Sequence, residues 1–238
     1  MENLKYKLTE NKKVINGITL YQIQALKSFN NVKINDLGGW VEKEENLSFY
    51  GDAWIYGDAR VSGNACVYGN ARVYGDAWIY GDARVSGNAW IYGDAWIYGD
   101  ARVSGNACVY GNALVYGNAL VYGNARVYGN ARVYGDAWIY GNALVYGNAL
   151  VYGNARVYGD ARVSGNAICE KNNIININTI YNITITQNHI QIGCKQKTIQ
   201  EWKDWLKSDD IIETHRDTDK FKKIKKALKA CFLLIKAR

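Results

Sequence analysis

The sequence predicts a mainly β protein, in which short strands stack into a solenoid closed by a β cap at one end and a β-plus-helix cap at the other. Three observations lead to this fold class. A phrase of Gly, Asp or Asn, Ala, any residue, Val or Ile, and Tyr or Ser recurs twenty times over 51–170 without insertion or deletion, the last copy being degenerate. Ala and Val or Ile alternate in each copy, which is the period-two pattern of a strand with one buried face. The chain has no proline, so every backbone N–H can join a ladder.

The hexad gives each of its six positions an expected place. Positions three and five point inward, as Ala53 and Ile55 do, and positions four and six, such as Trp54 and Tyr56, point outward. Glycine and Asp or Asn form the corners, because glycine tolerates positive φ freely and Asn and Asp tolerate it best among other residues. A six-residue unit cannot bury a core alone, so successive copies must stack.

This pattern resembles that of the hexapeptide-repeat proteins, in which an aliphatic residue recurs at every sixth position with a small residue two places before it. The flanks LYQIQALKSFNNVKINDLGGWVEKEENLS and ITITQNHIQIGCKQKTIQEWKDWL resemble the ends of bacterial and prophage-borne members, which are often labelled as transferases from fold alone. The resemblance implies a left-handed parallel β-helix with three hexads per coil, and hence between six and seven coils over 51–170. One departure is that Tyr or Ser, rather than Gly, follows the aliphatic residue.

Residues 1–50 form the expected N-terminal β cap, because an uncovered solenoid end is an open strand edge. Strands over 4–8 and 18–26 flank the Asn16-Gly17 pair, which is a strong signal for a hairpin turn. The stretch ENLSFY is interpreted as a degenerate hexad in register with the repeat, with Leu47 and Phe49 in its inward positions. The cap is therefore expected to run directly into the first coil.

Residues 171–238 form the expected C-terminal cap of decayed repeats, a hairpin and two helices. The hairpin is predicted around the Gln187-Asn188 pair by four alternating isoleucines: Ile183, Ile185, Ile190 and Ile192. Thr198 and Glu201 have the spacing of a capping box. They begin a first helix with one apolar face, formed by Ile199, Trp202 and Leu206.

The second helix, over 218–237, has an apolar stripe on one side. The stripe consists of Phe221, Ile224, Leu228, Cys231 and Ile235. We expect it to cover the open end of the last coil. Truncation after Glu170 is accordingly expected to leave the solenoid folded and to drive its end-to-end association.

The formal net charge of +7 lies in the C-terminal segment, since the charge is +1 over 1–50, −1 over 51–170 and +7 over 171–238. The longest apolar run near the C-terminus, 230–235, is too short to span a bilayer, and the N-terminus lacks an apolar signal core. None of the five cysteines forms a close CxxC pair. These features favour a reduced, cytoplasmic protein with no membrane partner.

An enzyme is the alternative from another class. The family resemblance implies two kinds of enzyme site. An acyltransferase of this kind would have a general-base histidine between subunits and loops that interrupt the repeat. A carbonic anhydrase of this kind would have a three-histidine zinc site. The repeat here has no histidine and no such loop, and the two histidines, His189 and His215, lie in the C-terminal segment. We expect no catalytic residue, no cofactor and no metal site, and an acyltransferase-like site between subunits remains the alternative.

Two further features have ordinary interpretations. Cys66 and Cys108 occupy position four, where Arg, Trp and Leu also occur, so a reactive thiol is not needed to explain them. Three aspartates fall in one corner column at an 18-residue period: Asp58, Asp76 and Asp94. Calcium could balance their charge, but water and the nearby Arg60 and Arg84 can do so without a metal.

The outward positions supply a candidate interaction surface. At an 18-residue period they form rows of Tyr, Arg and Trp, which is the composition of interface hot spots and of stacking platforms for single-stranded nucleic acid. The candidate residues are Trp78, Trp96, Arg84, Arg102, Tyr92, Tyr110 and Tyr128. The same residues would also stabilise the ladders without binding anything. The twenty residues from Gly51 recur from Gly93, seven hexads later, so duplication has shuffled residues among the faces.

The second helix supplies a candidate basic patch. Six of its lysines lie on the side opposite the stripe: Lys220, Lys222, Lys223, Lys225, Lys226 and Lys229, of which Lys222, Lys223, Lys225 and Lys226 form the patch. Such a face can bind nucleic acid or simply be solvated. The sequence thus predicts a non-catalytic structural or interaction solenoid, prophage-associated by resemblance, that binds a protein partner or itself. Nucleic-acid binding through the basic helix is a second alternative.

Overall fold

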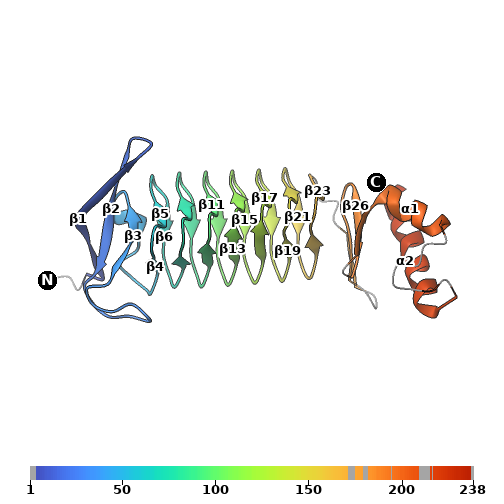
Figure 1. Ribbon diagram of the computed structural model, residues 1–238, viewed down its shortest axis with the longest axis horizontal. Coiled ribbons are helices and arrows are strands. Elements are labelled where there is room, and N and C mark those ends of the chain that lie inside the picture. Colours follow the sequence, from blue (N-terminus) through green and yellow to red (C-terminus); the bar gives the residue numbers. More distant parts are fainter. Residues whose placement is uncertain are drawn as a thin grey trace.

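The computed structural model describes residues 4–170, 175–178, 182–193, 195–208, 215 and 217–236. These residues form a straight rod, with an N-terminal β cap, a central β-solenoid and a C-terminal unit of one sheet and two helices (Figure 1). The fold is mainly β, as predicted. The solenoid makes about seven turns, since one of its sheets contains seven strands from successive turns.

The N-terminal cap is a hairpin extended by a third strand. Strands β1 (Tyr6–Ile15) and β2 (Ile18–Ala25) are antiparallel and meet at Asn16 and Gly17, whose φ angles of 51° and 81° are both positive. Strand β3 (Leu37–Val41) pairs antiparallel with β2 and parallel with the solenoid strand β5 (Arg60–Val61). The cap sheet therefore continues directly into one face of the solenoid.

The solenoid has three faces, each formed by one parallel sheet. Face A extends the cap sheet through β5, β8 (Trp78–Ile79), β11 (Trp96–Ile97), β14 (Leu114–Val115), β17 (Arg132–Val133), β20 (Leu150–Val151) and β23 (Ile168–Cys169). Face B contains β4 (Trp54–Ile55), β7 (Arg72–Val73), β10 (Trp90–Tyr92), β13 (Cys108–Gly111), β16 (Arg126–Gly129), β19 (Leu144–Val145) and β22 (Arg162–Val163). Face C contains β6 (Cys66–Val67), β9 (Arg84–Val85), β12 (Arg102–Val103), β15 (Leu120–Val121), β18 (Trp138–Ile139) and β21 (Arg156–Val157). Paired residues in these ladders lie 18 apart, as Trp96 and Leu114 do.

The core of the solenoid consists of the residues at positions three and five of the hexads. Ala107 and Val109, for example, are both 0 % exposed, and the inward assignment of these positions is confirmed along the repeat. The corner glycines are needed as well. Gly105 has a φ of 68°, and a Cβ there would lie 2.9 Å from the backbone nitrogen of Gly123 in the next turn.

Most, but not all, of the backbone hydrogen bonds between turns point the same way along the rod. N–H groups at outward positions donate to carbonyl groups of the following turn, as Cys108 does to Ala125 over 2.9 Å. In the other direction, the parallel pairing of Cys108 with Arg126 and of Val109 with Val127 has the Val127 N–H donate back to the Cys108 carbonyl. The first turn therefore presents mainly carbonyl groups (the carbonyl end), and the last turn presents mainly N–H groups (the N–H end). Both ends need caps, because buried backbone groups must find partners.

The carbonyl end is covered by donors from the N-terminal cap. The Lys5 ammonium donates to the carbonyls of Gly51 (3.3 Å) and Ala53 (2.9 Å). The side-chain amide of Asn46, in the short 3-10 helix Glu44–Asn46, donates to the carbonyls of Gly63 (3.1 Å) and Ala65 (2.8 Å).

The register of the degenerate hexad differs from the prediction. Leu47 is buried but bridges Val67, which lies 20 residues on rather than 18. Leu47 thus aligns with position five of the next turn, because Asn46 occupies the space where the hexad would place an inward side chain. Phe49 packs at the margin of the core, with its ring stacked 4.7 Å from that of Tyr6.

The N–H end is covered by a four-stranded antiparallel sheet. Its strands are β24 (Ile175–Asn178), β25 (Asn182–Ile185), β26 (His189–Ile192) and β27 (Lys195–Thr198). Side-chain oxygens accept from the last turn: Thr184 Oγ1 from the N–H of Arg162 (3.1 Å) and Asn188 Oδ1 from the N–H of Ile168 (3.0 Å). A polar face of this sheet, with Thr184, Thr186 and Gln191 all buried, therefore lies against the solenoid.

Two helices cover the opposite, apolar face of that sheet. Helix α1 (Ile199–Lys207) begins at the Thr198 and Glu201 capping box, and α2 (Asp219–Lys236) follows. They form a second core, separate from the solenoid core, whose buried members are Ile183, Ile185, Ile190, Ile192, Trp202, Trp205, Phe221, Leu228 and Cys231. Ile199, Leu206, Ile224 and Ile235 pack at its margin. The expectation that the α2 stripe covers the last coil is wrong, because the sheet lies between them. In the described part of the chain, no helix is long and apolar enough to cross a bilayer.

Candidate interaction surface

Stacked tyrosines at position six run along each face. On face B, neighbouring rings lie 4.6 Å apart for Tyr92 and Tyr110 and 4.8 Å apart for Tyr110 and Tyr128, with interplanar angles of 5° and 1°. Similar stacks run from Tyr80 to Tyr152 on face A and from Tyr122 to Tyr158 on face C. The strand spacing sets this distance, since the rings follow the ladder of the backbone.

The stacking decides what these tyrosines can recognise. Tyr110 and Tyr128 each have a ring stacked on both sides, so only ring edges and hydroxyl groups face solvent. A nucleic-acid base needs an open ring face to stack on. These predicted candidates therefore stabilise the rod and do not form a stacking platform.

The face B stack is interrupted beside Trp90. The Trp90 ring lies 6.4 Å from that of Tyr74 at an angle of 52°, and Tyr74, Trp90 and Tyr92 line a shallow hollow of about 340 Å³. Trp90 is 45 % exposed, and the guanidinium of Arg72 lies 5.6 Å from its ring.

Trp78 and Trp96, predicted together as surface residues, differ in exposure. Trp96 is 41 % exposed, whereas Trp78 is only 8 % exposed. Trp78 is covered because its indole N–H donates to Ser62 Oγ (3.1 Å), Arg60 lies 5.9 Å from its ring, and Trp96 packs edge-on at 5.7 Å. Trp78 is thus a support for Trp96 and not a contact residue.

Trp54 also departs from the prediction. The hexad pattern predicts that Trp54 points outward, but its side chain is 1 % exposed, because the N-terminal cap covers it. Its ring meets those of Tyr6 and Phe29 at 6.2 and 5.5 Å.

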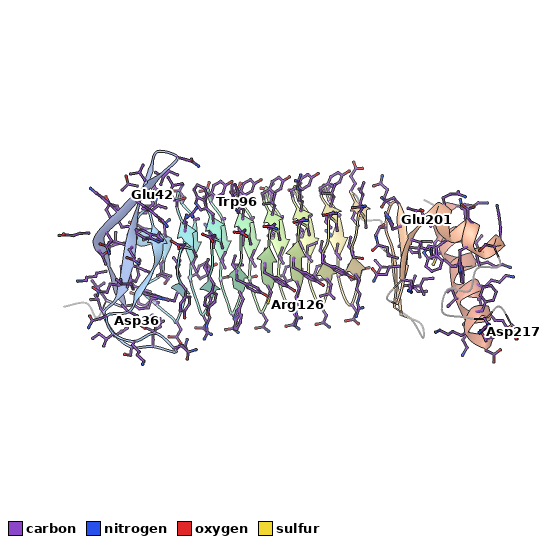
Figure 2. All side chains as sticks on the ribbon, viewed as in Figure 1. Asp36, Glu42, Trp96, Arg126, Glu201 and Asp217 are labelled. Atoms are coloured by element: carbon purple, nitrogen blue, oxygen red, sulfur yellow. The ribbon has the colours of Figure 1, made fainter. Side chains whose placement is uncertain are left out.

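The structure distributes the predicted surface residues over three faces. Arg84 and Arg102 are paired and exposed on face C, while Trp96 lies on face A and the tyrosines on face B. Figure 2 shows Trp96 at the upper edge of the rod and Arg126, a face B residue, lower down. The predicted set therefore does not form one site.

Two exposed tryptophans flank the corner between faces B and A, one on each face. Trp90 begins strand β10, which ends just before the Gly93-Asp94 corner, and Trp96 begins strand β11 just after it. Of the eight tryptophans, these two alone are exposed. We call Tyr74, Trp90, Tyr92, Asp94 and Trp96 the tryptophan edge. Sequence reasoning missed Trp90, although a signal was present, because 87–98 is the one place where consecutive hexads both carry Trp at position four.

Two aspartates of this corner column pair with cations from nearby elements. Asp58 pairs with Lys13 of β1 at 3.3 Å and Asp76 pairs with Arg60 at 3.6 Å. Lys13 thus takes the place expected for Arg84, which lies on face C. Among the described residues, no group of three or more His, Cys, Asp or Glu side chains could hold a metal ion.

The other residues considered for chemistry lie apart from this edge. Burial raises the pKa of the Cys66 and Cys108 thiols, which disfavours the nucleophilic thiolate. His189 begins β26, where burial lowers its pKa and the charge of Glu201 partly opposes this shift. His215 is exposed, and Cys194 lies outside the described residues. All four lysines of the predicted basic patch are exposed on α2.

These features define the protein as a β-solenoid repeat protein. More particularly, residues 53–93 and 95–169 match, in overlapping segments, the family model described as YdcK Beta solenoid repeat. The repeat segment is thus similar to that family. None of the curated proteins compared with the chain matches it. Membership of the hexapeptide-repeat superfamily, a transferase label and an association with prophages stay predictions.

Proposed function

We propose that this chain is a non-catalytic interaction module, in which a rigid left-handed solenoid with three hexads per turn presents the tryptophan edge to a protein partner. Segments 1–50, 51–170 and 171–238 act in it as cap, rod and cap. The exposure of Trp90 and Trp96, at 45 % and 41 %, is the observation that carries the proposal.

Exposed tryptophans on adjacent faces of a rigid rod have the properties of a binding hot spot. About 100 Å² of each tryptophan residue remains exposed, and its burial is worth about 2.5 kcal/mol at about 25 cal/mol/Å². Tryptophan is among the residues most enriched at hot spots, and neighbouring tyrosines and arginines commonly accompany it.

The solenoid supports this role by fixing both rings before a partner arrives. Backbone bonds to both adjacent turns hold the strands that carry them, as the 2.9 Å bond from Trp90 to Ala107 and the 3.0 Å bond from Trp96 to Ala113 illustrate. Trp78 and Tyr80 further pack against Trp96 at 5.7 and 6.3 Å. Pre-organised side chains lose less conformational entropy on binding, which strengthens the complex.

Site-specific photocrosslinking tests the proposal. The photoreactive residue p-benzoylphenylalanine is placed at Trp96 and, as a control on the same face, at Leu150. We expect the probe at 96 to capture a discrete protein. Capture with purified protein alone would identify the partner as a second copy of this chain, and capture that requires extract of the producing cells would identify it as another protein. A Trp90→Ala substitution in the labelled protein should reduce this capture by about tenfold or more. Equal capture at 96 and 150, or capture insensitive to Trp90, would refute the proposal.

A further inference from the structure

The outer side of α2 forms a continuous basic surface that contains exposed leucine. Lys222, Lys226, Lys229, Leu233 and Lys236 follow one another at helical spacing and are all exposed. We call these five residues the lysine face. Residues 217–236 contain seven lysines and two aspartates, so this segment is strongly cationic.

The lysine face lies at the end of the rod and points away from the solenoid. Phe221, Leu228 and Cys231, on the other side of α2, belong to the core shared with the sheet, and that sheet in turn covers the last turn. Figure 1 shows α2 as the terminal layer beyond the sheet. A flat surface can therefore meet the lysine face without contacting the solenoid.

Apolar groups interrupt this cationic surface at one place. Leu233 is 69 % exposed and Leu234 is 37 % exposed. Phe232 and Leu233, together with Lys229 and Lys236, line a hollow of about 260 Å³. The ammonium of Lys203 in α1 lies 5.9 Å from the Phe232 ring. An apolar floor bordered by ammonium groups is complementary to an anionic amphiphile.

We propose that the lysine face docks on the surface of an anionic lipid bilayer. The ammonium groups lie at the level of the anionic headgroups, and Leu233 enters the boundary between headgroups and acyl chains. Each lysine near such a surface strengthens binding by about fivefold. The expectation of no membrane partner rested on the lack of a spanning segment, and peripheral docking does not require one.

The exposed leucines favour a bilayer over nucleic acid. A phosphate backbone can pair with the lysines but offers nothing apolar to cover Leu233, whereas the boundary region of a bilayer does both. This inference is independent of the proposed function, because α2 and the tryptophan edge are different surfaces.

Vesicle flotation with the full chain tests the proposal. Vesicles of phosphatidylcholine are compared with vesicles of equal parts phosphatidylcholine and phosphatidylglycerol. The variants are Lys222→Glu with Lys226→Glu, and Leu233→Ser, all at exposed positions. The matched control is Lys7→Glu with Lys12→Glu, which makes the same charge change at exposed positions of β1 in the N-terminal cap.

We expect binding to the anionic vesicles only. The α2 charge reversal should weaken it by about 25-fold or more, Leu233→Ser should weaken it by about tenfold, and the control should leave it within about twofold. Equal loss in the control, or equal binding to both vesicle types, would overturn the proposal. Binding to polyuridylic acid that is unaffected by Leu233→Ser, without binding to vesicles, would overturn it in favour of a nucleic-acid surface.

Discussion

Lys5 connects the carbonyl-end cap to a measurable pH dependence. Its side chain is 1 % exposed, and its ammonium donates to the carbonyls of Gly51 and Ala53. Burial lowers the pKa of Lys5 from 10.5 to about 8, a shift that the charge of Asp52 partly opposes. The folded protein thus binds a proton at Lys5 more weakly than the unfolded chain does.

The sign of the effect follows from this difference. Between the folded pKa of about 8 and the unfolded value of 10.5, the unfolded chain holds more protons, so the free energy of unfolding rises with pH. The contribution is largest above 10.5 and is lost as the pH falls through about 8. For these two pKa values the gain between pH 7 and pH 10 is about 2.5 kcal/mol.

The test compares the wild-type protein with Lys5→Met by urea unfolding at a series of pH values from 7 to 10. Taking the difference between the two proteins cancels the tyrosines, several of which also have a raised pKa. We expect the wild type to gain about 2.5 kcal/mol over the variant across this range. Lys7→Met, an exposed neighbour in β1, should show no such trend. A wild-type minus Lys5→Met difference that is flat with pH would refute the buried position of Lys5.

Three further predictions concern the repeat. Val109→Asp places an unpaired carboxylate at a 0 % exposed position and should abolish soluble expression. Leu114→Asp, at an outward position, should still fold, as judged by circular dichroism. Equal damage from both substitutions would contradict the inward assignment. Tyr110→Ala removes a ring that stacks on two neighbours, whereas Tyr146→Ala removes a ring that stacks on one. In urea unfolding, Tyr110→Ala should therefore lose about 2 kcal/mol and Tyr146→Ala about 1 kcal/mol. Equal losses would contradict a role for stacking. The Asn106 side-chain amide accepts a hydrogen bond from Asn88 and donates one to Asn124. Asn106→Asp removes the donated bond and should lower the free energy of unfolding by about 1 kcal/mol in thermal or urea unfolding. An unchanged stability would show that the amide ladder contributes nothing.

The solenoid could be predicted from the sequence because every hexad meets the same surroundings. The alternation of Ala107 and Val109, repeated in each copy, suffices to define the buried face, and the corner glycines follow from positive φ. Neighbouring turns consist of the same phrase, so the local pattern already contains the tertiary contacts.

The exposure of individual outward residues could not be predicted in this way. Trp54, Trp78 and Trp96 occupy the same position of the identical hexad GDAWIY, yet their exposed fractions are 1, 8 and 41 %. The N-terminal cap covers the first ring and Arg60 with Trp96 covers the second. Exposure depends on what lies above each ring, and this is not a property of the hexad.

The caps were predicted as elements but not in their chemistry. The sequence indicated strands at both ends and helices at the C-terminal end, but Lys5 and Asn46 act on carbonyls between 17 and 48 residues away. The two-residue register shift at Leu47 also arises there, because the Asn46 amide, and not an apolar inward side chain, meets the first turn. Such contacts have no periodic signal.

The direction of the backbone bonds changes what truncation should do. Two solenoids can continue each other's parallel ladders only if the N–H end of one meets the carbonyl end of the other, because two like ends would have to pair their strands antiparallel. Removal of 171–238 exposes the N–H end alone, since Lys5, Asn46 and β3 still cover the carbonyl end. The truncated chain 1–170 has an open N–H end and a covered carbonyl end, so the expected growth into long species should not occur.

Removal of both caps should have the opposite effect. The segment 51–170 leaves both the carbonyl end and the N–H end open, and its near-identical hexads allow any copy to continue any other. We expect 51–170 to form long fibres visible by electron microscopy, and 1–170 to remain as short particles at the same concentration. Fibres of 1–170 as long as those of 51–170 would show that the association does not follow the backbone polarity. The caps would then act by covering apolar surface, and not by matching donors to one end and acceptors to the other.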